Sequence, residues 1–258
     1  MLFLISPAKA LDYETPPVTA THTHPLFVPQ ASELIEVLRE KSPQQIAELM
    51  DLSDQLSGLN VARYQAWRPK FSPKTAKQAV LAFDGDVYGG LDAKTLSEDE
   101  LAWTQQHLCI LSGLYGVLRP LDLMRPYRLE MGTRLQTHKG RNLYQFWGTQ
   151  IADYLNQRAA ADATPVVVNL ASEEYFKSVD RKALKPRVVT CVFEEFKAGK
   201  YKVISFMAKR ARGLMVRHAV RERAVSVEQL KRFDAEGYRY MADVSDPDRL
   251  VFRREAAC

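Results

Sequence analysis

The stretch "RVVTCVFEEFKAGKYKVISF", Arg187 to Phe206, decides the class of fold. It contains two segments rich in valine, isoleucine and aromatic residues, Arg187 to Phe193 and Tyr201 to Phe206, separated by a short segment with Gly199. Such residues favour strands, and a short connection containing glycine favours an antiparallel hairpin. The stretch therefore predicts two paired antiparallel strands.

Further strands are expected on both sides of this hairpin. Strand-sized apolar runs occur at "LFLIS", "VLAF", "CILSG" and "VVVNLA", and "GYRYM" is expected to pair with "RLVFRR" across "ADVSDPD" as a second hairpin. Crossover connections mixed with hairpins produce a mixed sheet covered by helices. We expect an α/β fold with some α+β character, as one domain over residues 1–258 with a single mixed β-sheet flanked by helices.

Serine caps and apolar spacing predict helices in the first half. Ser42 with Gln45 and Ser97 with Glu100 have the spacing of capping boxes, and Ser72 is followed by a proline suited to a first helical turn. The helices expected on these grounds are "SPQQIAELM", "SPKTAKQAV", "SEDELAWTQQHL" and, from its apolar spacing, "ASELIEVLREK".

Composition limits the class of protein. The chain of 258 residues is 46% hydrophobic and 26% charged, which is typical of soluble globular proteins. No apolar run approaches the roughly 20 residues of a membrane span, and the N-terminus lacks the basic region of a signal peptide. We expect a cytoplasmic monomer that does not contact a membrane.

Cysteines and histidines argue against a metal or a cofactor. Cys109 and Cys191 lie in apolar segments and are expected to be buried, and Cys258 is expected to be part of a frayed end. The five histidines are scattered and no CxxC is present. The common nucleotide-binding and hydrolase motifs are also absent. We expect no cofactor and no tightly bound metal, and the catalytic residues, if any, are unknown.

Charge is distributed unevenly along the chain. The first 60 residues hold three basic and eight acidic residues, and the remainder holds 33 basic and 23 acidic residues. A basic body favours a polyanionic partner that binds after residue 60, although solvated lysines and arginines would give the same balance.

The segment "LSDQLSGLNVARYQAW", Leu52 to Trp67, resembles a helix-hairpin-helix element spanning about residues 47–68. In such an element, a tight turn directs backbone N–H groups at a DNA phosphate. Gly58 matches the first glycine of the turn, Asn60 replaces the second, and Arg63 follows one helical turn later. An ordinary helical corner with Gly58 as its C-cap is the alternative.

The segment "SFMAKRARGLMVRHAVRER" predicts a helix with an arginine stripe. Helical spacing separates a small apolar face from a basic face, made up respectively of Ala208, Ala211, Met215 and Ala219, and of Arg210, Arg217 and Arg221. The guanidinium fork matches phosphate geometry, so this face favours an anion contact over simple solvation.

Basic and aromatic side chains also occur beside predicted strand ends, where open α/β sheets place their ligands. The stretch "LSGLYGVLRPLDLMRPYRLEMG" carries three arginines on a loop stiffened by two prolines. We hypothesise that Lys9, Lys177, Arg119 and Arg128 converge on one rim of the sheet, with Tyr88 as a further candidate.

Several long sequence motifs of this chain occur together in one known family. From Met1 to about Phe252, the chain is similar to the YaaA peroxide-stress family of bacteria. The motifs that carry this resemblance are "LISPAKALD", "SGLNVARY", "FDGDVYGGL", "LSGLYGVLRPLDLMRPYRLEMG", "NLYQFWG", "NLASEEYFKSV" and "ISFMAKRARGLM". The chain departs from the family at Ala10, where a threonine is expected, and in its C-terminal tail. The resemblance implies survival of hydrogen peroxide, with less unincorporated iron and less damage to DNA and protein.

The resemblance also implies DNA binding in a basic cleft with a helix-hairpin-helix element. It supports Gly58, Asn60 and Arg63 as phosphate contacts, and it favours as cleft residues Arg119, Arg125, Arg128, Lys177, Lys209 and Arg210. The expected partner is double-stranded or structured DNA, held mainly through its backbone phosphates. No catalytic residue is implied.

Two other functions stay open on sequence grounds. An enzyme acting on a nucleotide, a damaged DNA base or another phosphorylated substrate could use the polar residues at strand ends, among them Lys9, Asp86, Tyr88, Glu130 and Lys177. Direct iron sequestration is opposed by the basic charge and the scattered histidines, because iron sites need clustered carboxylates and imidazoles.

Overall fold

The computed structural model describes residues 1–255, so Cys258 lies outside the described residues. Its main sheet has eight strands in the order β11-β12-β9-β8-β1-β5-β6, with β10 paired to β9. The strands are β1 (Leu2–Ile5), β5 (Leu108–Ser112), β6 (Gly116–Leu118), β8 (Val166–Asn169), β9 (Arg187–Lys197), β10 (Lys200–Lys202), β11 (Arg239–Tyr240) and β12 (Arg249–Arg254).

The sheet mixes parallel and antiparallel pairs. β1 is parallel to β5 and β8, and β9 is parallel to β8 and β12. The antiparallel pairs are β5 with β6, β9 with β10, and β11 with β12. The two hairpins expected from sequence are confirmed, and so is the α/β fold with a mixed sheet.

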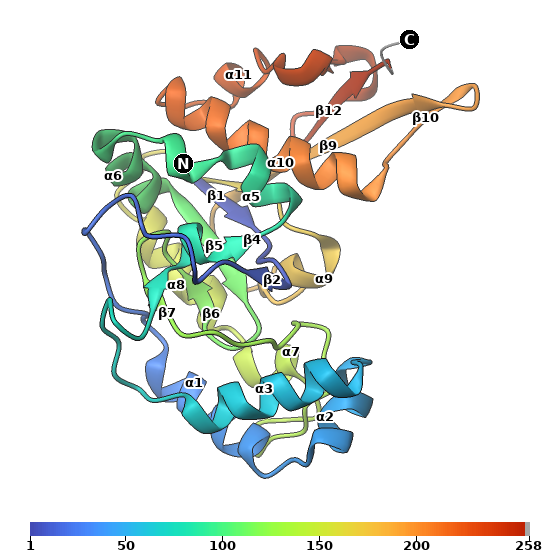
Figure 1. Cartoon of the computed structure of the whole chain (residues 1–258). Coiled ribbons are helices and arrows are strands. Elements are labelled where there is room, and N and C mark those ends of the chain that lie inside the picture. The colour runs from blue at the N-terminus through green and yellow to red at the C-terminus, as the bar shows by residue number, and fades with distance from the viewer. Residues whose placement is uncertain (256–258) are drawn as a thin grey trace.

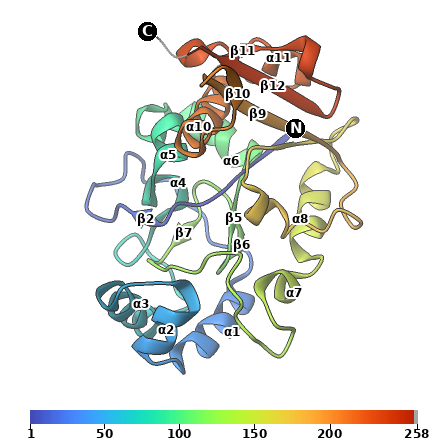
Figure 2. The same cartoon turned by 90° about the vertical axis from the view of Figure 1, so that its right-hand side faces the viewer.

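Helices surround this sheet, and two further pairs of short strands lie beside it, β2 (Ala10–Leu11) with β4 (Phe83–Asp84) and β3 (Lys77–Gln78) with β7 (Leu123–Met124). The helices are α1 (Val28–Arg39), α2 (Pro43–Met50), α3 (Asp54–Ala66), α4 (Ala79–Ala82), α5 (Asp86–Leu91), α6 (Glu98–His107), α7 (Leu143–Trp147), α8 (Gln150–Ala159), α9 (Glu173–Phe176), α10 (Ser205–Arg221) and α11 (Val227–Leu230). Figures 1 and 2 show α1, α2 and α3 at one end of the molecule and α10, α11 and β12 at the other. Within residues 1–255, no helix is both long and apolar enough to cross a bilayer.

Two of the three predicted serine caps are confirmed. The Ser42 hydroxyl accepts a hydrogen bond from the Gln45 N–H at 3.2 Å, and the Ser97 hydroxyl accepts one from the Glu100 N–H at 3.2 Å, each with a reciprocal side-chain bond. The helix predicted after Ser72 is wrong, because a turn there leads into β3, which pairs with β7.

The strand predicted at Val80–Phe83 is also largely wrong. Most of this segment is the short helix α4, and the N–H groups of Ala79 and Val80 donate to the carbonyls of Asp122 and Pro120. These long-range contacts override the strand preference of the segment. The sequence of the segment alone does not indicate that such contacts form.

The predicted hairpin turn at Gly58 is wrong. Helix α3 runs without interruption through Gly58 and Asn60, and Gly58 has no positive φ. The Asn60 amide donates to the Leu56 carbonyl at 2.8 Å and is fully buried, so it stabilises the helix from within. Neither the phosphate-binding turn nor the C-cap alternative forms, so the turn geometry that motivated Gly58 and Asn60 as phosphate contacts is absent from α3.

The real connection between α2 and α3 lies earlier in the chain. Asp51 adopts a left-handed conformation at φ 51°, and Ser53 is the N-cap of α3. The two helices expected near residues 47–68 therefore exist, but their junction is at residues 51–53. Asp51 is one of the polar residues that tolerate this conformation.

Helices α5 and α10 cross with their backbones in contact. A Cβ atom on Gly213 would lie 1.8 Å from the Val87 carbonyl oxygen, and one on Gly90 would lie 2.2 Å from the Arg210 carbonyl oxygen. The predicted small apolar face of α10 is confirmed, because Ala208, Ala211, Met215 and Ala219 are all buried. Only glycine allows such a close approach of two helices.

The two described cysteines are buried, as expected. Burial raises the pKa of both the Cys109 and the Cys191 thiol to about 12. The thiolate is the form that reacts with peroxide, so both side chains are inert at neutral pH.

Replacing Gly58 by alanine tests the uninterrupted helix. No atom lies within 4 Å of a Cβ at this exposed position, so we expect Gly58→Ala to raise the free energy of unfolding by about 0.5–1 kcal/mol. Urea denaturation measures the change. A loss of stability would instead indicate a turn that needs glycine.

Adjacent glycines of α5 test the helix crossing. Gly90→Ala or Gly213→Ala should lower the free energy of unfolding by about 3 kcal/mol or more, because backbone atoms cannot move aside. Gly89→Ala is the matched control, since the nearest atom to its Cβ is the flexible Arg210 Nη1 at 3.8 Å. Equal effects at Gly89 and Gly90 in thermal unfolding would contradict the crossing.

Candidate functional site

A pocket of about 430 Å³ lies at the carboxyl ends of β1 and β8. Its walls come from the loop after β1 (Ser6–Ala10), the β4–α5 junction (Asp84–Tyr88), the start of α9 and the first turns of α10. In the sheet, β1 lies between β5 and β8, and the chain reaches these neighbours by separate crossovers. Crevices at such switch points are the usual ligand sites of open α/β sheets.

Hydrogen bonds hold the inner part of the pocket together. The Ser172 N–H donates to the Ser6 hydroxyl at 2.9 Å, and this hydroxyl donates to the Ser172 hydroxyl at 3.2 Å. The Tyr88 hydroxyl donates to the Ser6 carbonyl at 3.1 Å. Burial raises the pKa of Tyr88 and Tyr175 well above the ordinary value, so both phenols stay neutral. The pocket is therefore rigid and partly aromatic.

Two of the pocket carboxylates already have partners. Glu130 accepts from the Lys9 ammonium at 2.8 Å and from the Arg128 guanidinium at 3.0 Å. Glu174 accepts from the Gly132 N–H at 2.8 Å. The negative charge of Glu130 is thus balanced by neighbouring cations, and Glu174 is held in place by backbone.

Two cations of α10 enter the same pocket without such partners. Lys209 and Arg212 both line it, and within residues 1–255 neither side chain makes an ion pair or a hydrogen bond. Burial lowers the pKa of Arg212 from its ordinary value. A partly desolvated guanidinium without an acceptor is unusual, because buried charges are normally paired.

Some of the residues predicted from sequence lie in or next to this pocket. Lys9, Tyr88 and Lys209 line it, and Arg128 reaches it through Glu130. The Lys177 ammonium lies 5.1 Å from the centre of the Tyr144 ring, and the Tyr144 hydroxyl donates to the Glu174 carbonyl. Of the four residues expected to converge on one rim of the sheet, Lys9, Arg128 and Lys177 therefore lie at or near this pocket.

Arg63 and Arg125 lie beside this group. The Tyr64 hydroxyl donates to the Arg128 carbonyl, which joins α3 to the segment after β7. Burial raises the pKa of Tyr13, and the charges of Arg63 and Arg125 oppose that rise, which places both guanidinium groups near the same phenol. The Nε atom of Arg128 is buried without a hydrogen-bond partner.

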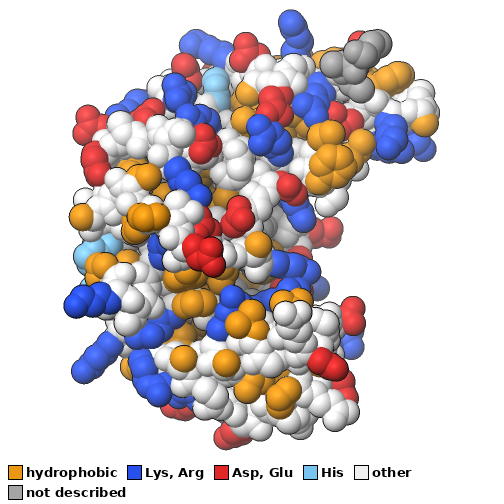
Figure 3. Space-filling view, in the orientation of Figure 1, with side chains coloured by type: hydrophobic (Ala, Val, Ile, Leu, Met, Phe, Trp, Pro, Cys, Tyr) orange, Lys and Arg blue, Asp and Glu red, His pale blue; other side chains and the backbone are white. Residues whose placement is uncertain are grey.

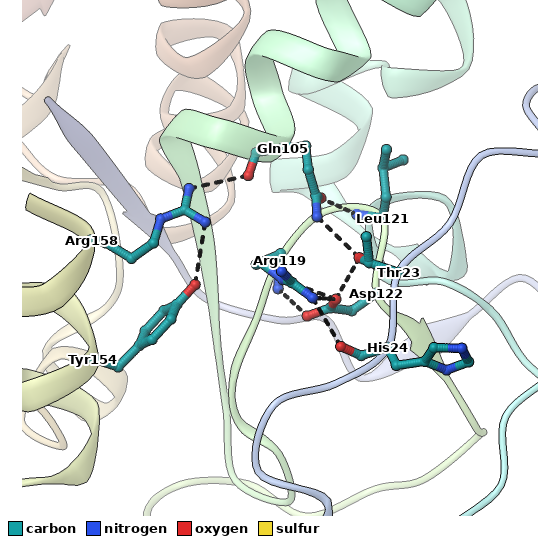
Figure 4. A network of polar contacts seen from close by, with 8 residues as sticks. All are labelled: Thr23, His24, Gln105, Arg119, Leu121, Asp122, Tyr154 and Arg158. Atoms are coloured by element: carbon teal, nitrogen blue, oxygen red, sulfur yellow. Dashed lines mark hydrogen bonds and ion pairs between the residues drawn. The ribbon is translucent and has the colours of Figure 1, made fainter.

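Arg119 was expected on the same rim, and this expectation is wrong. β6 is antiparallel to β5, with Leu118 opposite Ile110, so Arg119 continues toward the amino end of the sheet. Its guanidinium binds the buried carboxylate of Asp122 at 2.8 Å and the His24 carbonyl at 2.9 Å, as Figure 4 shows. Arg119 holds the fold together at the edge opposite the pocket.

The arginine stripe of α10 is also engaged within the protein. Arg210 forms an ion pair with Glu236 at 2.6 Å, and Arg217 donates to the Leu91 carbonyl and the Thr95 hydroxyl, both at 2.8 Å. Arg221, at the far end of the helix, is exposed. A phosphate could reach Arg210 only in competition with Glu236.

Sequence reasoning missed Arg212, Ser6 and Ser172. Arg212 follows Lys209 by three residues, so both project from one face of a helix, and this spacing could have revealed the pair. Ser6 and Ser172 lie just beyond β1 and β8. Their proximity depends on strand order, which no local signal in the sequence specifies.

The side of the molecule in Figure 3 has a wide notch between the α10 and β9–β10 region and the α2–α3 region. Lysine and arginine side chains border it together with aspartates and glutamates. The basic cleft expected from sequence is not seen on this face. Basic groups are instead interspersed with acidic ones.

The mixed sheet and the pocket at the ends of β1 and β8 define an α/β protein with a polar pocket. Comparison with known sequences assigns it further: the chain belongs to the family described as peroxide stress protein YaaA, whose model matches residues 1–244. It is 73% identical to a UPF0246 protein of Polaromonas sp. (strain JS666) over the full length of both chains. It is 67% identical to one from Albidiferax ferrireducens, covering 99% of this chain and 98% of the relative. This membership supports a role related to oxidative stress.

Substituting Arg119 tests its structural assignment. Arg119→Gln would leave the buried carboxylate of Asp122 without its cation, so the free energy of unfolding should fall by about 3 kcal/mol. Arg187→Gln, which breaks the exposed pair with Asp248, is the control and should change it by less than about 1 kcal/mol. Unchanged stability of Arg119→Gln in urea denaturation would refute the assignment.

Proposed function

We propose that the protein binds double-stranded or structured DNA, mainly through backbone phosphates, as part of a cytoplasmic response to peroxide. One observation carries this proposal: within residues 1–255, none of Arg63, Arg125, Lys177 and Lys209 forms an ion pair. Phosphate oxygens are the acceptors that such groups match, and contacts of this kind position a protein on DNA without reading its sequence.

The β9–β10 hairpin adds a second group of cations. Lys200 lies directly opposite Lys197 in this antiparallel pair, and Lys202 follows one residue beyond Tyr201. Like charges directly opposite each other destabilise a hairpin, and a bound phosphate would remove that repulsion. Figure 1 shows the hairpin projecting from the body, and Figure 3, in the same orientation, shows the notch below it. It is therefore available to a large partner.

Binding of this kind offers a physical link to iron. DNA attracts cations to its phosphates, and each protein cation that replaces one of them releases a counterion into solution. Ferrous ions on DNA would be released in the same way. DNA covered by the protein would then hold fewer ferrous ions, which convert peroxide into a damaging radical.

The pocket favours a second candidate, an enzyme acting on a nucleotide, a damaged base or another phosphorylated substrate. Pockets of this size accept small molecules, whereas duplex binding needs only a surface. Incubation of the protein with labelled duplex separates the two: release of a base or a change in strand length identifies an enzyme, and unchanged DNA favours a binding protein.

Salt dependence tests the DNA proposal. If about four phosphates are neutralised, the logarithm of the binding constant should fall with the logarithm of salt concentration with a slope of about −3.6. Arg63→Gln should weaken binding to unrelated duplexes by similar factors and reduce the slope by about 0.9. Fluorescence anisotropy at several salt concentrations measures both.

The exposed Lys185, before β9 at the amino edge of the sheet, supplies the matched control. Lys185→Gln removes one positive charge away from the proposed contacts, so its affinity and slope should equal those of the wild type. Binding that does not change between low and moderate salt would contradict the proposal.

A further inference from the structure

We propose that the pocket at the ends of β1 and β8 binds a single nucleotide, with its phosphate on Arg212 and Lys209 and its base among the apolar and aromatic walls. This goes beyond DNA binding through surface phosphates, which needs no enclosed site. The ligand is either a free nucleoside monophosphate or one nucleotide turned out of a DNA strand, since both present the same chemistry.

Arg212 is the strongest indication of an anion. Its side chain is partly buried at the pocket wall, and no described residue supplies an acceptor for its five N–H donors. Arg210, two residues earlier, shows the usual arrangement, because Glu236 neutralises it. A partly buried guanidinium with no carboxylate partner is free to bind a ligand, and its planar fork matches two phosphate oxygens.

Lys209 places a second cation beside the first. Residues three apart on a helix are neighbours on one face, and both Lys209 and Arg212 line the pocket. The crossing of α5 and α10 brings this face close to the β4–α5 junction, because Gly213 allows the backbone of α10 to touch Val87. The two cations therefore lie on a rigid wall.

The remaining walls suit a sugar and a base. Pro7, Ala8 and Val87 supply apolar surface, and Tyr88 and Tyr175 supply rings whose pKa values keep them neutral. Base rings stack on aromatic side chains with about 1–3 kcal/mol per base. The volume of about 430 Å³ falls within the range of small-molecule sites, roughly 300–1,000 Å³.

The acidic residues of the pocket are compatible with an anionic ligand. Glu130 is neutralised by Lys9 and Arg128, and Glu174 is bonded to the Gly132 N–H. Asp84 and Asp86 are exposed and form no ion pair within residues 1–255, so their oxygens can accept hydrogen bonds from sugar hydroxyls or base amino groups. The pocket thus offers donors at one wall and acceptors at another.

Calorimetric titration of the full-length protein tests the proposal. The four deoxynucleoside 5′-monophosphates are compared with the corresponding nucleosides, which lack the phosphate. At least one monophosphate should bind, and its nucleoside should bind at least about tenfold more weakly, because a charge-assisted contact to phosphate is lost.

Variants of α10 assign the phosphate contact. Arg212→Gln should remove most of the difference in affinity between the monophosphate and the nucleoside while leaving nucleoside binding unchanged, which a merely structural role would not do. Lys209→Gln, at an exposed position that does not endanger folding, should weaken monophosphate binding several-fold. Arg221→Gln, an exposed arginine of the same helix that does not line the pocket, is the control and should bind as the wild type does.

A duplex with one unpaired nucleotide distinguishes the two sources of ligand. If it displaces the monophosphate and a fully paired duplex does not, the natural ligand is a nucleotide of DNA; if neither does, it is a free nucleotide. The absence of monophosphate binding at millimolar concentration, or an unchanged affinity in Arg212→Gln, overturns the proposal.

Duplex binding measured on the same samples keeps the two proposals separate. Intact duplex binding without monophosphate binding refutes only the pocket. Monophosphate binding without duplex binding refutes only the proposed function.

Discussion

The close crossing of α5 and α10, which Gly90 and Gly213 make possible, is the constraint on which the site depends. Their backbones approach so closely that a Cβ on either glycine would overlap a carbonyl oxygen. This contact fixes the first turns of α10 against the β4–α5 junction, next to the loop that leaves β1. A wider crossing would move Lys209 and Arg212 away from the carboxyl end of the sheet. The position of these two cations therefore depends on Gly90 and Gly213 having no side chain.

The two ends of the sheet differ in how their charges are satisfied. At the amino end, Asp122 is buried and accepts from Arg119 and from the Thr23 hydroxyl, and Gln105 and Arg158 continue the set of contacts in Figure 4. At the carboxyl end, Arg212 and Lys209 have no partner among residues 1–255. Paired charges support a fold, and unpaired charges held on rigid elements are available to a ligand. The proposed nucleotide site rests on that difference.

Local signals in the sequence predicted much of the fold and part of the site. The Gly199 hairpin and the Ser42 and Ser97 caps depend on residues close in sequence, and they formed as expected. The turn predicted at Asn60 was wrong because the Asn60 amide donates to the backbone carbonyl four residues earlier, and this hydrogen bond supports a continuous helix. The position predicted for Arg119 was wrong because the antiparallel pairing of β6 with β5 decides which end of the sheet Arg119 reaches. Strand order and helix crossings arise from distant contacts, which a single sequence does not display.

Hydrogen exchange with and without duplex DNA tests most directly whether one side of the molecule carries the binding function. The account predicts slower exchange in α3, in the segment from Arg125 to Gly132, in the β9–β10 hairpin and in the first turns of α10. It predicts unchanged exchange around Arg119, Asp122 and Gln105. Slower exchange at that amino end, with none at α10 or the hairpin, would contradict the account.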